Sequence, residues 1–513
     1  MAMSASNMHV DETPSDLQNF YRNKTVFVTG GTGFMGIVFI EKLLRATEVK
    51  RVYMLVRPKR EKSADERLAI LFQNTLFDKL RATGVNPTDR IHPILGDCNQ
   101  ENIGISPQNR KLLINEVNVV IHLAATVRFN ETLYKATCIN VRATLDLIKL
   151  AKEMKHLEAF VHVSSAFANC VVHSIDEKYY NNKLSVSAKK MCELCDTLGF
   201  ETTNKLEEAL CKEYRNTYTY TKALAEEAVL SEGRSLPISV FRPAIVIQTY
   251  NEPLPGWIGN LHGPSAILYA SGRGVLRVMF MKAYQRAHLV PADYCANLML
   301  AIGWETAKRS KQECLKMAPP IYNYSNHDDN PLNWKQYIST IEDYGYEVAL
   351  TKMIWYPFLI TVDKKWLYLL LTVFYHTIPG YILDFLLVLK GKKRRMIELY
   401  SKIEKQSSAL DYFIMNNFEF TMENTMALWN SLTARDKELF NFDLRSIYWK
   451  EYIQYTLKGM RLYLCGETPD SLPSAKKKYK KFVILHYTLT RLLFVGLFLL
   501  LWTLLKTFFF LIN

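Results

Sequence analysis

A tyrosine and a lysine four residues apart are the side chains of this sequence best suited to proton transfer. In the stretch TYTYTKALAE, Tyr218 precedes Lys222 by about one helical turn, so both side chains share a face if the stretch is helical. A free tyrosine, with a pKa of about 10, donates a proton poorly near neutral pH. A neighbouring ammonium lowers that pKa, and the pair is therefore predicted to donate a proton to an oxygen atom of a bound substrate.

A serine hydroxyl completes the candidate site. Ser165 follows the apolar stretch FVHV, and a hydroxyl at the end of a strand can polarise a carbonyl oxygen through a hydrogen bond. Ser164 is the alternative for this role. Serine, tyrosine and lysine in this order predict reduction of a carbonyl group without a metal ion. A zinc site is not expected, because the nine cysteines include only one closely spaced pair.

Strands and helices alternate in the part of the chain that must position these residues. Short apolar segments, separated by amphipathic ones, occupy residues 25–30, 51–56, 91–96, 117–124, 159–165 and 238–243. Such alternation predicts an α/β fold with a Rossmann-type, doubly wound parallel sheet. The pattern fades after about residue 340, and the 513 residues exceed what a single core accommodates.

A glycine-rich turn between the first strand and the first helix predicts dinucleotide binding. In VFVTGGTGFMG, small residues allow a tight turn and let a pyrophosphate approach the backbone at the start of the helix. Both the spacing of Gly30, Gly33 and Gly36 and the GxGxxG pattern from Gly31 fit this role. The residues of the turn expected to contact the cofactor are Gly30, Thr32, Gly33, Phe34, Met35 and Gly36.

Basic residues after the second strand favour NADPH over NADH. The stretch LVRPKR places Arg57 and Lys59 where an NAD site would usually carry an acid for the ribose hydroxyls. Arginine's planar fork matches a phosphate, although a solvated basic loop is the alternative reading. The other expected cofactor contacts are Asp97 with the adenine, Ala124 and Ala125 with the nicotinamide half, and Lys222 with the nicotinamide ribose.

Two apolar segments near the C-terminus predict contact with a membrane. Residues 492–505 form an uncharged run after the basic cluster KKKYKK, which is typical of an anchor whose preceding side stays cytosolic. A hairpin within one leaflet and a buried helix are the alternatives. Residues 367–389 carry only His376 and Asp384 as ionisable groups, and Pro379–Gly380 interrupts them. For this segment a helix pair lying on the membrane and a buried pair are equally expected, and peripheral contact ranks slightly above a span, which stays an alternative.

Charge and composition give the predicted domain organisation and partners. Lys plus Arg outnumber Asp plus Glu by 64 to 50, with clusters at 392–395 and 476–481 that suit anionic lipids, phosphorylated ligands or RNA. The clusters alone do not distinguish between these ligands; membrane lipid is an expected partner, and nucleic acid is not. The predicted ranges are an N-terminal arm (1–20), a catalytic domain (21–345), a mostly helical C-terminal domain (346–467) and a membrane anchor (482–512).

Several of these motifs together resemble the fatty acyl-CoA reductases, a membrane-associated branch of the extended short-chain dehydrogenase/reductases. They are TVFVTGGTGFMG, HLAATVRFNE, HVSSAFAN, NTYTYTKALAE, FRPAIV and EPLPGWIGNLHGP. The resemblance covers about residues 15–467, and its later part is similar to that family's male sterility C-terminal domain. It implies reduction of a long-chain acyl-CoA to a primary alcohol with two NADPH, through a hemithioacetal and an enzyme-bound aldehyde, with release of CoA.

The resemblance also implies roles for individual residues. Tyr218 would be the proton donor, Lys222 its electrostatic support and ribose ligand, and Ser165 the residue that holds the carbonyl oxygen. Pro243 of FRP would orient the nicotinamide carboxamide. The stretch at 252–264 is either a loop on the substrate side or a structural turn, and the insertion at 176–212 is expected to shape the acyl entrance.

Other readings of the same motifs stay open at this stage. Another membrane-bound extended short-chain dehydrogenase, acting on a sterol or another lipid carbonyl, would share the glycine turn and the tyrosine–lysine pair. A non-catalytic scaffold that binds NADPH at a membrane is a further alternative. We expect a membrane protein whose catalytic domain faces the cytosol, at the endoplasmic reticulum, with the peroxisome and the lipid droplet as alternatives and a homo-oligomer possible.

Overall fold

The computed structural model describes residues 13–58, 61–261, 263–311, 317–326 and 328–512. The chain divides into two compact units that interleave along the sequence. The first unit comprises Met1–Pro255, His288–Pro331 and Phe418–Ile447, and the second comprises Gly256–Ala287, Leu332–Asn417 and Tyr448–Asn513. These units cut across the ranges 21–345 and 346–467 that the sequence suggested, because segments far apart in the chain pack together.

A parallel sheet forms the centre of the first unit, as predicted. Its described strands lie in the order β11, β7, β5, β4, β1, β2, β3, and every neighbouring pair is parallel. The inner strands are buried on both faces, which explains their nearly continuous apolar sequences. The strands are β1 (Thr25–Thr29), β2 (Arg51–Val56), β3 (Ile91–Leu95), β4 (Val119–His122), β5 (Ala159–Val163), β7 (Ile238–Pro243) and β11 (Ile321–Tyr324).

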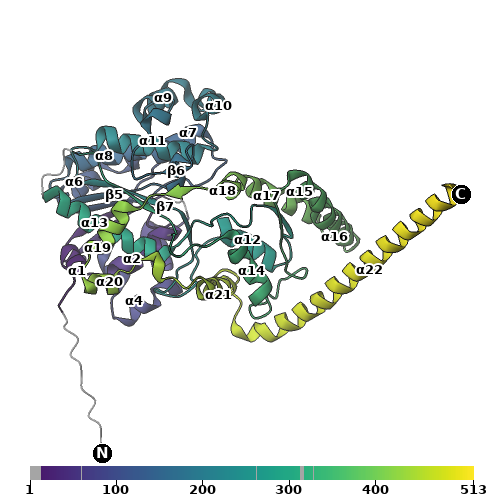
Figure 1. Cartoon of the computed structure of the whole chain (residues 1–513). Helices are drawn as coiled ribbons and strands as arrows, with labels where there is room; N and C mark the ends of the chain where they lie inside the picture. Colours follow the sequence, from purple (N-terminus) through teal and green to yellow (C-terminus); the bar gives the residue numbers. More distant parts are fainter. Residues whose placement is uncertain (1–12, 59–60, 262, 312–316, 327, 513) are drawn as a thin grey trace, which may run out of the picture. The chain divides into compact units, whose positions relative to one another are not determined.

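Helices cover both faces of this sheet, so the fold is doubly wound. One face carries α2 (Phe34–Ala46) and α13 (Ala292–Lys311), with α1 (Asp16–Tyr21) packed on α13. The other carries α8 (Ala143–Glu153) and α11 (Thr217–Glu232), with α6 (Pro107–Glu116) beside α8. In Figure 1, α8 and α11 lie above the sheet and α2 lies below it. The strand order changes direction between β1 and β4: β2 and β3 are added on one side of β1, and β4, β5, β7 and β11 on the other. Ligands bind at this switch point in such folds.

Shorter elements complete the first unit. The insertion between β5 and α11 forms α9 (Ala188–Lys205) and α10 (Glu207–Cys211). From the C-terminal part of the chain, β13 (Glu419–Phe420) pairs with β6 (Ser174–Ile175), and α19 (Glu423–Ser431) packs on β11. The remaining elements are α3 (Ala64–Phe72), η1 (Thr75–Phe77), α4 (Asp78–Ala82), α5 (Pro87–Arg90), η2 (Glu101–Gly104), α7 (Leu133–Ala136), η3 (Thr137–Arg142), η4 (Ala166–Asn169), η5 (Asn181–Lys183), β8 (Ile245–Ile247), β10 (Leu289–Pro291), α20 (Ala434–Leu439) and η8 (Leu444–Ser446).

The second unit is mostly helical, as expected for the C-terminal part. A pair of parallel strands, β9 (Val278–Phe280) and β12 (Ile360–Val362), lies among its helices. By length and composition, the stretches Lys365–Leu389 and Pro469–Phe508 could each cross a membrane. The helices are α12 (Gly263–Gly272), α14 (Trp334–Tyr344), α15 (Lys365–Thr372), η7 (Val373–Thr377), α16 (Ile378–Leu389), α17 (Met396–Ser408), α18 (Asp411–Met415), α21 (Trp449–Gly459), η9 (Met460–Leu464), η10 (Pro469–Ser471) and α22 (Leu472–Ile512).

Candidate active site

The predicted Ser, Tyr and Lys meet where β5 ends and α11 begins. Ser165 lies two residues beyond the end of β5, and Tyr218 and Lys222 lie in the first two turns of α11. The Asn216 side chain fixes the start of this helix by accepting a hydrogen bond from the backbone N–H of Thr219 at 2.8 Å. The helix therefore presents the tyrosine and the lysine one turn apart, as their spacing predicted.

Lys222 is a buried cation at the carboxyl end of the sheet. Only 3% of its surface is exposed, and its Nζ donates a hydrogen bond to the carbonyl oxygen of Val163 at 2.7 Å. Burial lowers the pKa of Lys222 from 10.5 to about 8, and the Glu226 carboxylate, one turn further along α11, opposes that shift. Lys222 therefore stays protonated at neutral pH and loses its proton as the pH rises through about 8.

Tyr218 is half-buried and forms a hydrogen bond with the Ser165 hydroxyl. The ring of Phe129 packs against its ring, with 5.9 Å between the ring centroids. Burial raises the pKa of Tyr218, and the hydrogen bond with Ser165 partly offsets this effect. The sequence argument expected Lys222 to lower this pKa, but in the structure burial dominates.

The structure distinguishes between the two serines proposed for the third position. The Ser164 hydroxyl points into the protein and donates to Glu226 Oε1 at 2.5 Å. Ser165 instead forms the hydrogen bond with Tyr218. Ser165 is therefore the serine that shares a site with the tyrosine, and Ser164 belongs to the buried layer beneath it.

That buried layer is an ion pair that the sequence reasoning missed. Glu226 and Arg242 are almost completely buried and lie 2.6 Å apart between Oε2 and Nη2, with a second contact of 2.8 Å from Nε to Oε1. Asn169 also donates to Glu226 Oε2, at 3.0 Å. The Arg242 guanidinium further donates to the carbonyl oxygens of Asp176 and Lys178, both at 3.0 Å. The pair links α11 to β7 one helical turn after Lys222.

A second missed residue, Asn140, connects the loop after β4 to α11. It lies in the π-helical turn η3, and its Oδ1 accepts from the backbone N–H of Thr126 at 2.9 Å. Its Nδ2 donates to the hydroxyl of Thr221, the neighbour of Lys222, also at 2.9 Å. Such π-helical turns frequently occur at functional sites, but their positions leave no clear signal in a single sequence.

The glycine turn has the backbone geometry of a phosphate cradle. Gly30 has a φ of 74°, and a Cβ at this position would lie 2.6 Å from the backbone nitrogen of Ala124. A Cβ at Gly36 would lie 2.3 Å from the carbonyl oxygen of Gly30. Gly33 is the N-cap residue of α2, and both Gly33 and Thr32 are exposed. The start of this helix is therefore open to an anionic group.

The remaining turn residues and the residues after the neighbouring strands lie around this cradle. Phe34 and Met35 begin α2 and are half-buried. Ala124 and Ala125 follow β4 and are also half-buried, and the N–H of Ala124 donates to the Thr29 hydroxyl at 3.3 Å. Pro243, which ends β7, is buried. These positions meet at the carboxyl edge of the sheet, where a dinucleotide fits.

The residues proposed for the adenosine half lie after β2 and β3. Arg57 is exposed just beyond β2, and Asp97 follows β3, where its Oδ1 accepts from the backbone N–H of Asn99 at 2.9 Å. The two residues follow neighbouring strands, which pair with Val56 opposite Leu95 at their carboxyl ends. Lys59 falls outside the described residues.

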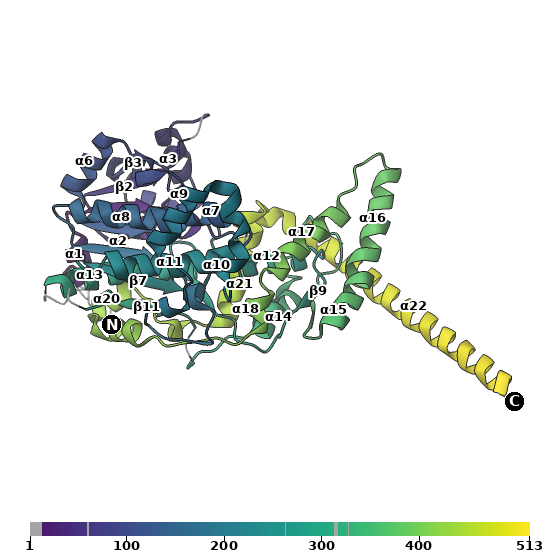
Figure 2. The same ribbon diagram turned by 90° about the horizontal axis from the view of Figure 1, so that it is seen from above.

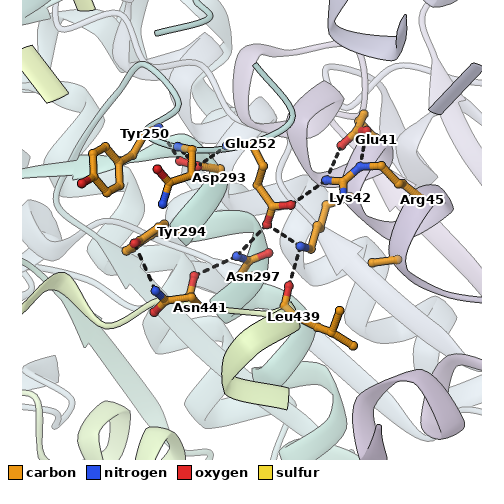
Figure 3. A network of polar contacts seen from close by, with 12 residues as sticks. Glu41, Lys42, Arg45, Tyr250, Glu252, Asp293, Tyr294, Asn297, Leu439 and Asn441 are labelled. Carbon is orange, nitrogen blue, oxygen red and sulfur yellow. Dashed lines mark hydrogen bonds and ion pairs between the residues drawn. The ribbon is translucent and has the colours of Figure 1, made fainter. Parts of the chain in front are cut away.

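The beginning of the 252–264 stretch is held by a buried ionic network (Figure 3). Glu252 forms ion pairs with Lys42 and with Arg45, the latter at 2.8 Å, and both cations belong to the helix that follows the glycine turn. Asp293 accepts hydrogen bonds from the backbone N–H groups of residues 250–252, at 2.8 to 3.0 Å. For this part of the stretch, the structure supports the reading as a structural turn.

Comparison with known proteins identifies the family. A family described as male sterility protein matches residues 28–299, and another with the same description matches residues 375–467. Fatty acyl-CoA reductase wat of Drosophila melanogaster is 43% identical over 480 residues, which cover 93% of this chain and 91% of that protein. This chain belongs to the fatty acyl-CoA reductase family. Fatty acyl-CoA reductase 2 of Homo sapiens is 35% identical to this reductase, over 94% of it and 92% of the human protein.

Solved structures with a similar fold are more distant in sequence. The reductase domain of a nonribosomal peptide synthetase from Mycobacterium tuberculosis has a TM-score of 0.56 at 19% identity, covering 86% of the reductase and 92% of that chain. The terminal R domain from the myxalamid PKS-NRPS pathway has a TM-score of 0.55 at 17% identity, covering 86% and 90%. These likenesses show the Rossmann-like fold alone.

Proposed function

We propose that this reductase converts a long-chain fatty acyl-CoA to a primary fatty alcohol, consumes two NADPH, releases CoA and keeps the aldehyde bound between the two reductions. The observation that carries the proposal is the hydrogen bond between Ser165 and Tyr218 at the end of β5, with Lys222 one turn further along α11. Membership of the fatty acyl-CoA reductase family supplies the substrate class and the product.

The side chains have distinct roles in this proposal. Tyr218 donates its proton to the substrate oxygen, and Ser165 polarises the same oxygen through its hydroxyl. The Lys222 ammonium stabilises the tyrosinate that remains after proton transfer and binds the nicotinamide ribose. Pro243 orients the nicotinamide carboxamide. The hydrogen bond from Lys222 to Val163 supports this assignment, because it holds the ammonium at the end of the strand that leads to Ser165.

Both reductions use the same proton donor. When bound at this site, NADPH would supply a hydride to the carbonyl carbon, and a second NADPH would replace the NADP⁺ before the second reduction. In the first reduction, Tyr218 protonates the thioester oxygen and a hemithioacetal forms. The hemithioacetal hydroxyl then loses its proton as the carbon–sulfur bond breaks and the carbonyl group forms, the leaving sulfur takes up a proton so that CoA departs as a thiol, and an aldehyde remains in the site. Tyr218 must regain a proton before it protonates the aldehyde oxygen in the second reduction, which yields the alcohol.

The glycine cradle and the basic residue after β2 support NADPH as the cofactor. The open start of α2 fits the pyrophosphate, and Asp97 and the exposed Arg57 follow the paired strands β3 and β2, where the adenosine half of a dinucleotide is expected. An arginine there matches the charge and the planar geometry of a 2′-phosphate. Arg57 and Lys59 are the proposed phosphate ligands, with Asp97 at the adenine and Ala124 and Ala125 at the nicotinamide half.

We also propose that residues 482–512 anchor the reductase to the endoplasmic reticulum, with the catalytic unit in the cytosol. The apolar side chains of 492–505 are exposed in α22, and basic residues precede them, which supports an anchor with a cytosolic N-terminal side. Fluorescence microscopy of the tagged full chain with organelle markers tests this proposal. Localisation at peroxisomes or lipid droplets alone would contradict it.

Product analysis tests the proposed reaction. Detergent-purified protein is incubated with NADPH and acyl-CoAs of increasing chain length, while NADPH oxidation is followed and lipid products are identified by mass spectrometry. The expected result is one alcohol for every two NADPH oxidised, without accumulation of free aldehyde. Aldehyde as the main product would contradict the bound intermediate. Tight NADPH binding without turnover of any acyl-CoA would contradict the reaction itself, in favour of another carbonyl substrate or a non-catalytic scaffold.

A further inference from the structure

The stretch Lys365–Leu389 of the second unit exposes a long apolar face. The segments α15, η7 and α16 follow one another without interruption and carry large side chains that the rest of the unit leaves uncovered. Successive members of this apolar stripe are four or seven positions apart, close to one or two turns of a helix, so they lie along one side of it. The largest lie between 48% and 67% exposed, and they are Trp366, Leu370, Phe374, Tyr381, Phe385 and Leu389.

Polar contacts fix the opposite face of the same helix. His376 accepts a hydrogen bond at Nε2 from the backbone N–H of Arg277 at 2.9 Å, and the Arg277 side chain donates to the carbonyl oxygen of Tyr375, also at 2.9 Å. Two turns later, the buried Asp384 accepts from the backbone N–H groups of residues 395–397, at 2.8 to 3.1 Å. The carboxylate therefore caps the start of α17, which lies beside α16 (Figure 2).

These contacts are incompatible with a helix that crosses the bilayer. A span would carry the Arg277 guanidinium and the paired strands β9 and β12 toward the hydrocarbon core, because they pack on the fixed face of this helix. Open strand edges and isolated charges do not occur in lipid-exposed positions at that depth. A helix lying along the surface leaves those groups on its aqueous side and buries only the apolar stripe.

Basic residues follow the apolar stripe directly. Lys390, Lys392, Lys393, Arg394 and Arg395 are all exposed after Leu389, and Lys364 and Lys365 are exposed at the other end of the helix. Long cationic side chains at both ends of an apolar helix can reach the phosphate groups of a membrane surface. Their charge is complementary to anionic lipid headgroups.

We infer that Lys365–Leu389 lies parallel to the bilayer and inserts its apolar stripe into one leaflet, with residues 390–395 bound to anionic lipid headgroups. The reductase then has a second membrane contact, distinct from α22 and unable to act as a span. This inference does not depend on the reaction proposed above, since it rests on the second unit alone.

Depth measurements on the full chain in bilayers test the orientation of the helix. Single spin labels are introduced through Trp366→Cys, Phe374→Cys and Phe385→Cys, and the reductase is reconstituted into vesicles of phosphatidylcholine and phosphatidylserine. Collision rates with oxygen and with a water-soluble nickel chelate give the depth of each label. The native cysteines, measured in the unsubstituted chain, give the background, and Tyr284→Cys, at a position 83% exposed in the same unit, is the aqueous control.

The two orientations predict different depth profiles. A helix in the membrane plane gives the three labels a similar, shallow depth. A span would place the label at 374 deepest and those at 366 and 385 nearer to opposite surfaces, which would overturn the inference. Protection of all three labels from both oxygen and nickel would also overturn it, because a protein surface rather than lipid would then cover the stripe.

Charge reversal tests the role of residues 390–395 separately. The variant Lys392→Glu, Lys393→Glu, Arg394→Glu is expected to reduce the oxygen accessibility of the label at 385 at least twofold in phosphatidylserine vesicles. The matched reversal of three exposed lysines of the second unit outside both basic clusters, Lys282, Lys335 and Lys458, should leave it unchanged. Equal values for the two variants would contradict binding of these headgroups by residues 390–395.

Discussion

At the scale of single residues, the charge on Lys222 depends on two opposing effects. Burial lowers its pKa to about 8, and the carboxylate of Glu226 raises it. The charge of Lys222 in turn acts on His122 of β4 and His162 of β5: burial lowers the pKa of each histidine, and the neighbouring ammonium lowers it further. Glu226 is therefore the charge that keeps this ammonium protonated near neutral pH.

Removal of that carboxylate should move the alkaline limit of activity. In the native reductase, kcat/KM is expected to fall as the pH rises through about 8, because Lys222 loses its proton. In Glu226→Gln, the carboxylate no longer raises this pKa, so the decline should begin at lower pH. Initial rates across the pH range, taken at a temperature where the variant is folded, measure the shift.

A neighbouring variant provides the control for this pH profile. Glu227 lies next to Glu226 but faces α9, where its Oε2 accepts from the backbone N–H of Ala188 at 2.7 Å. Glu227→Gln should keep the native alkaline limit. The positioning role of Glu226 would be contradicted by equal shifts in both variants, or by a loss of rate in Glu226→Gln without any shift.

The proposed preference for NADPH should depend on Arg57. In Arg57→Ser, loss of a charge-assisted contact worth about 1.5–3 kcal/mol should raise the KM for NADPH at least tenfold and leave the KM for NADH nearly unchanged. The comparison variant is Arg234→Ser, an exposed arginine at the amino end of β7. Steady-state kinetics with both cofactors measure the effect, and an equal increase for NADH would count against a 2′-phosphate contact.

Whether a pair of site residues could be predicted from the sequence depended on how close its members are along the chain. Tyr218 and Lys222 were recognisable because their relation is set within one helical turn. The Glu226–Arg242 pair was not recognised, because its partners lie 16 residues apart and meet only when α11 packs against β7. Its one sequence signal is that Glu226 follows Lys222 by four residues, on the same helical face.

At the scale of elements, the ionic network at Glu252 joins the chain after β7 to α2. Burial alone would raise the pKa of Glu252, but the charges of Lys42 and Arg45 outweigh it and lower the pKa to about 2. Lys42 is itself buried and also donates to the carbonyl oxygen of Leu439 at 2.6 Å. The network thereby connects the helix of the glycine turn with two distant segments of the first unit.

Loss of the Glu252 charge should destabilise the reductase and change its response to acid. Glu252→Gln leaves Lys42 buried beside a neutral partner, which should cost about 3 kcal/mol of unfolding free energy. Because the folded-state pKa is below the ordinary 4.5, the native ion pairs stabilise fully above that pH and less as the pH falls toward about 2. Urea unfolding at pH 7 and pH 4 should show a smaller acid-induced loss in the variant than in the native chain.

An exposed glutamate supplies the comparison. Glu48 forms an ion pair with Arg22 at 2.9 Å, but its side chain is 70% exposed, so Glu48→Gln should change stability little at either pH. An equal loss of stability in both variants would refute the special contribution of the buried network.

The sequence predicted most elements of the sheet but not all of them. Six strands were found because their apolar runs are long and flanked by helical patterns. The seventh, β11, was missed, since IYNY is short and carries a polar residue, Asn323, whose Nδ2 donates to the carbonyl oxygens of Ile175 and Thr421. Its place at the edge beside β7 follows from packing rather than from its own sequence.

At the scale of the whole molecule, the chain order does not match the order of the compact units. Residues 418–447 return to the first unit, where Tyr324 donates to the carbonyl oxygen of Phe442 at 2.7 Å. The sequence pattern indicated a change near residue 340 but could not reveal this return, because helical periodicity says nothing about which core a helix joins. The similarity of the family over nearly the whole chain is consistent with both units acting together in one enzyme.

The terminal helix α22 should combine a structural part with an anchoring part. Its first turns place Ala475 and Tyr479 in an apolar cluster with Leu350 and Met353, whereas residues 492–505 are exposed. A chain ending at 490 should therefore keep the native melting temperature and its activity on dispersed acyl-CoA, but bind vesicles more weakly.

A shorter chain tests the structural part of α22. A chain ending at 470 loses Tyr479 and should be less stable by about 2–3 kcal/mol, the value expected for the burial of one large side chain. Thermal unfolding and vesicle flotation measure the two effects. Equal stability of the chains ending at 470 and 490 would contradict this division of the helix.

The most direct test of the proposed reaction compares two tyrosines of α11. Tyr218→Phe removes the proposed proton donor, whereas Tyr220→Phe removes a buried hydroxyl that instead contacts Ser185 at 2.8 Å. With NADPH and a long-chain acyl-CoA, we predict that kcat for alcohol formation falls at least a hundredfold in Tyr218→Phe, with NADPH affinity retained, and stays near the native value in Tyr220→Phe. Native alcohol production by Tyr218→Phe would contradict the assignment of this tyrosine as the proton donor.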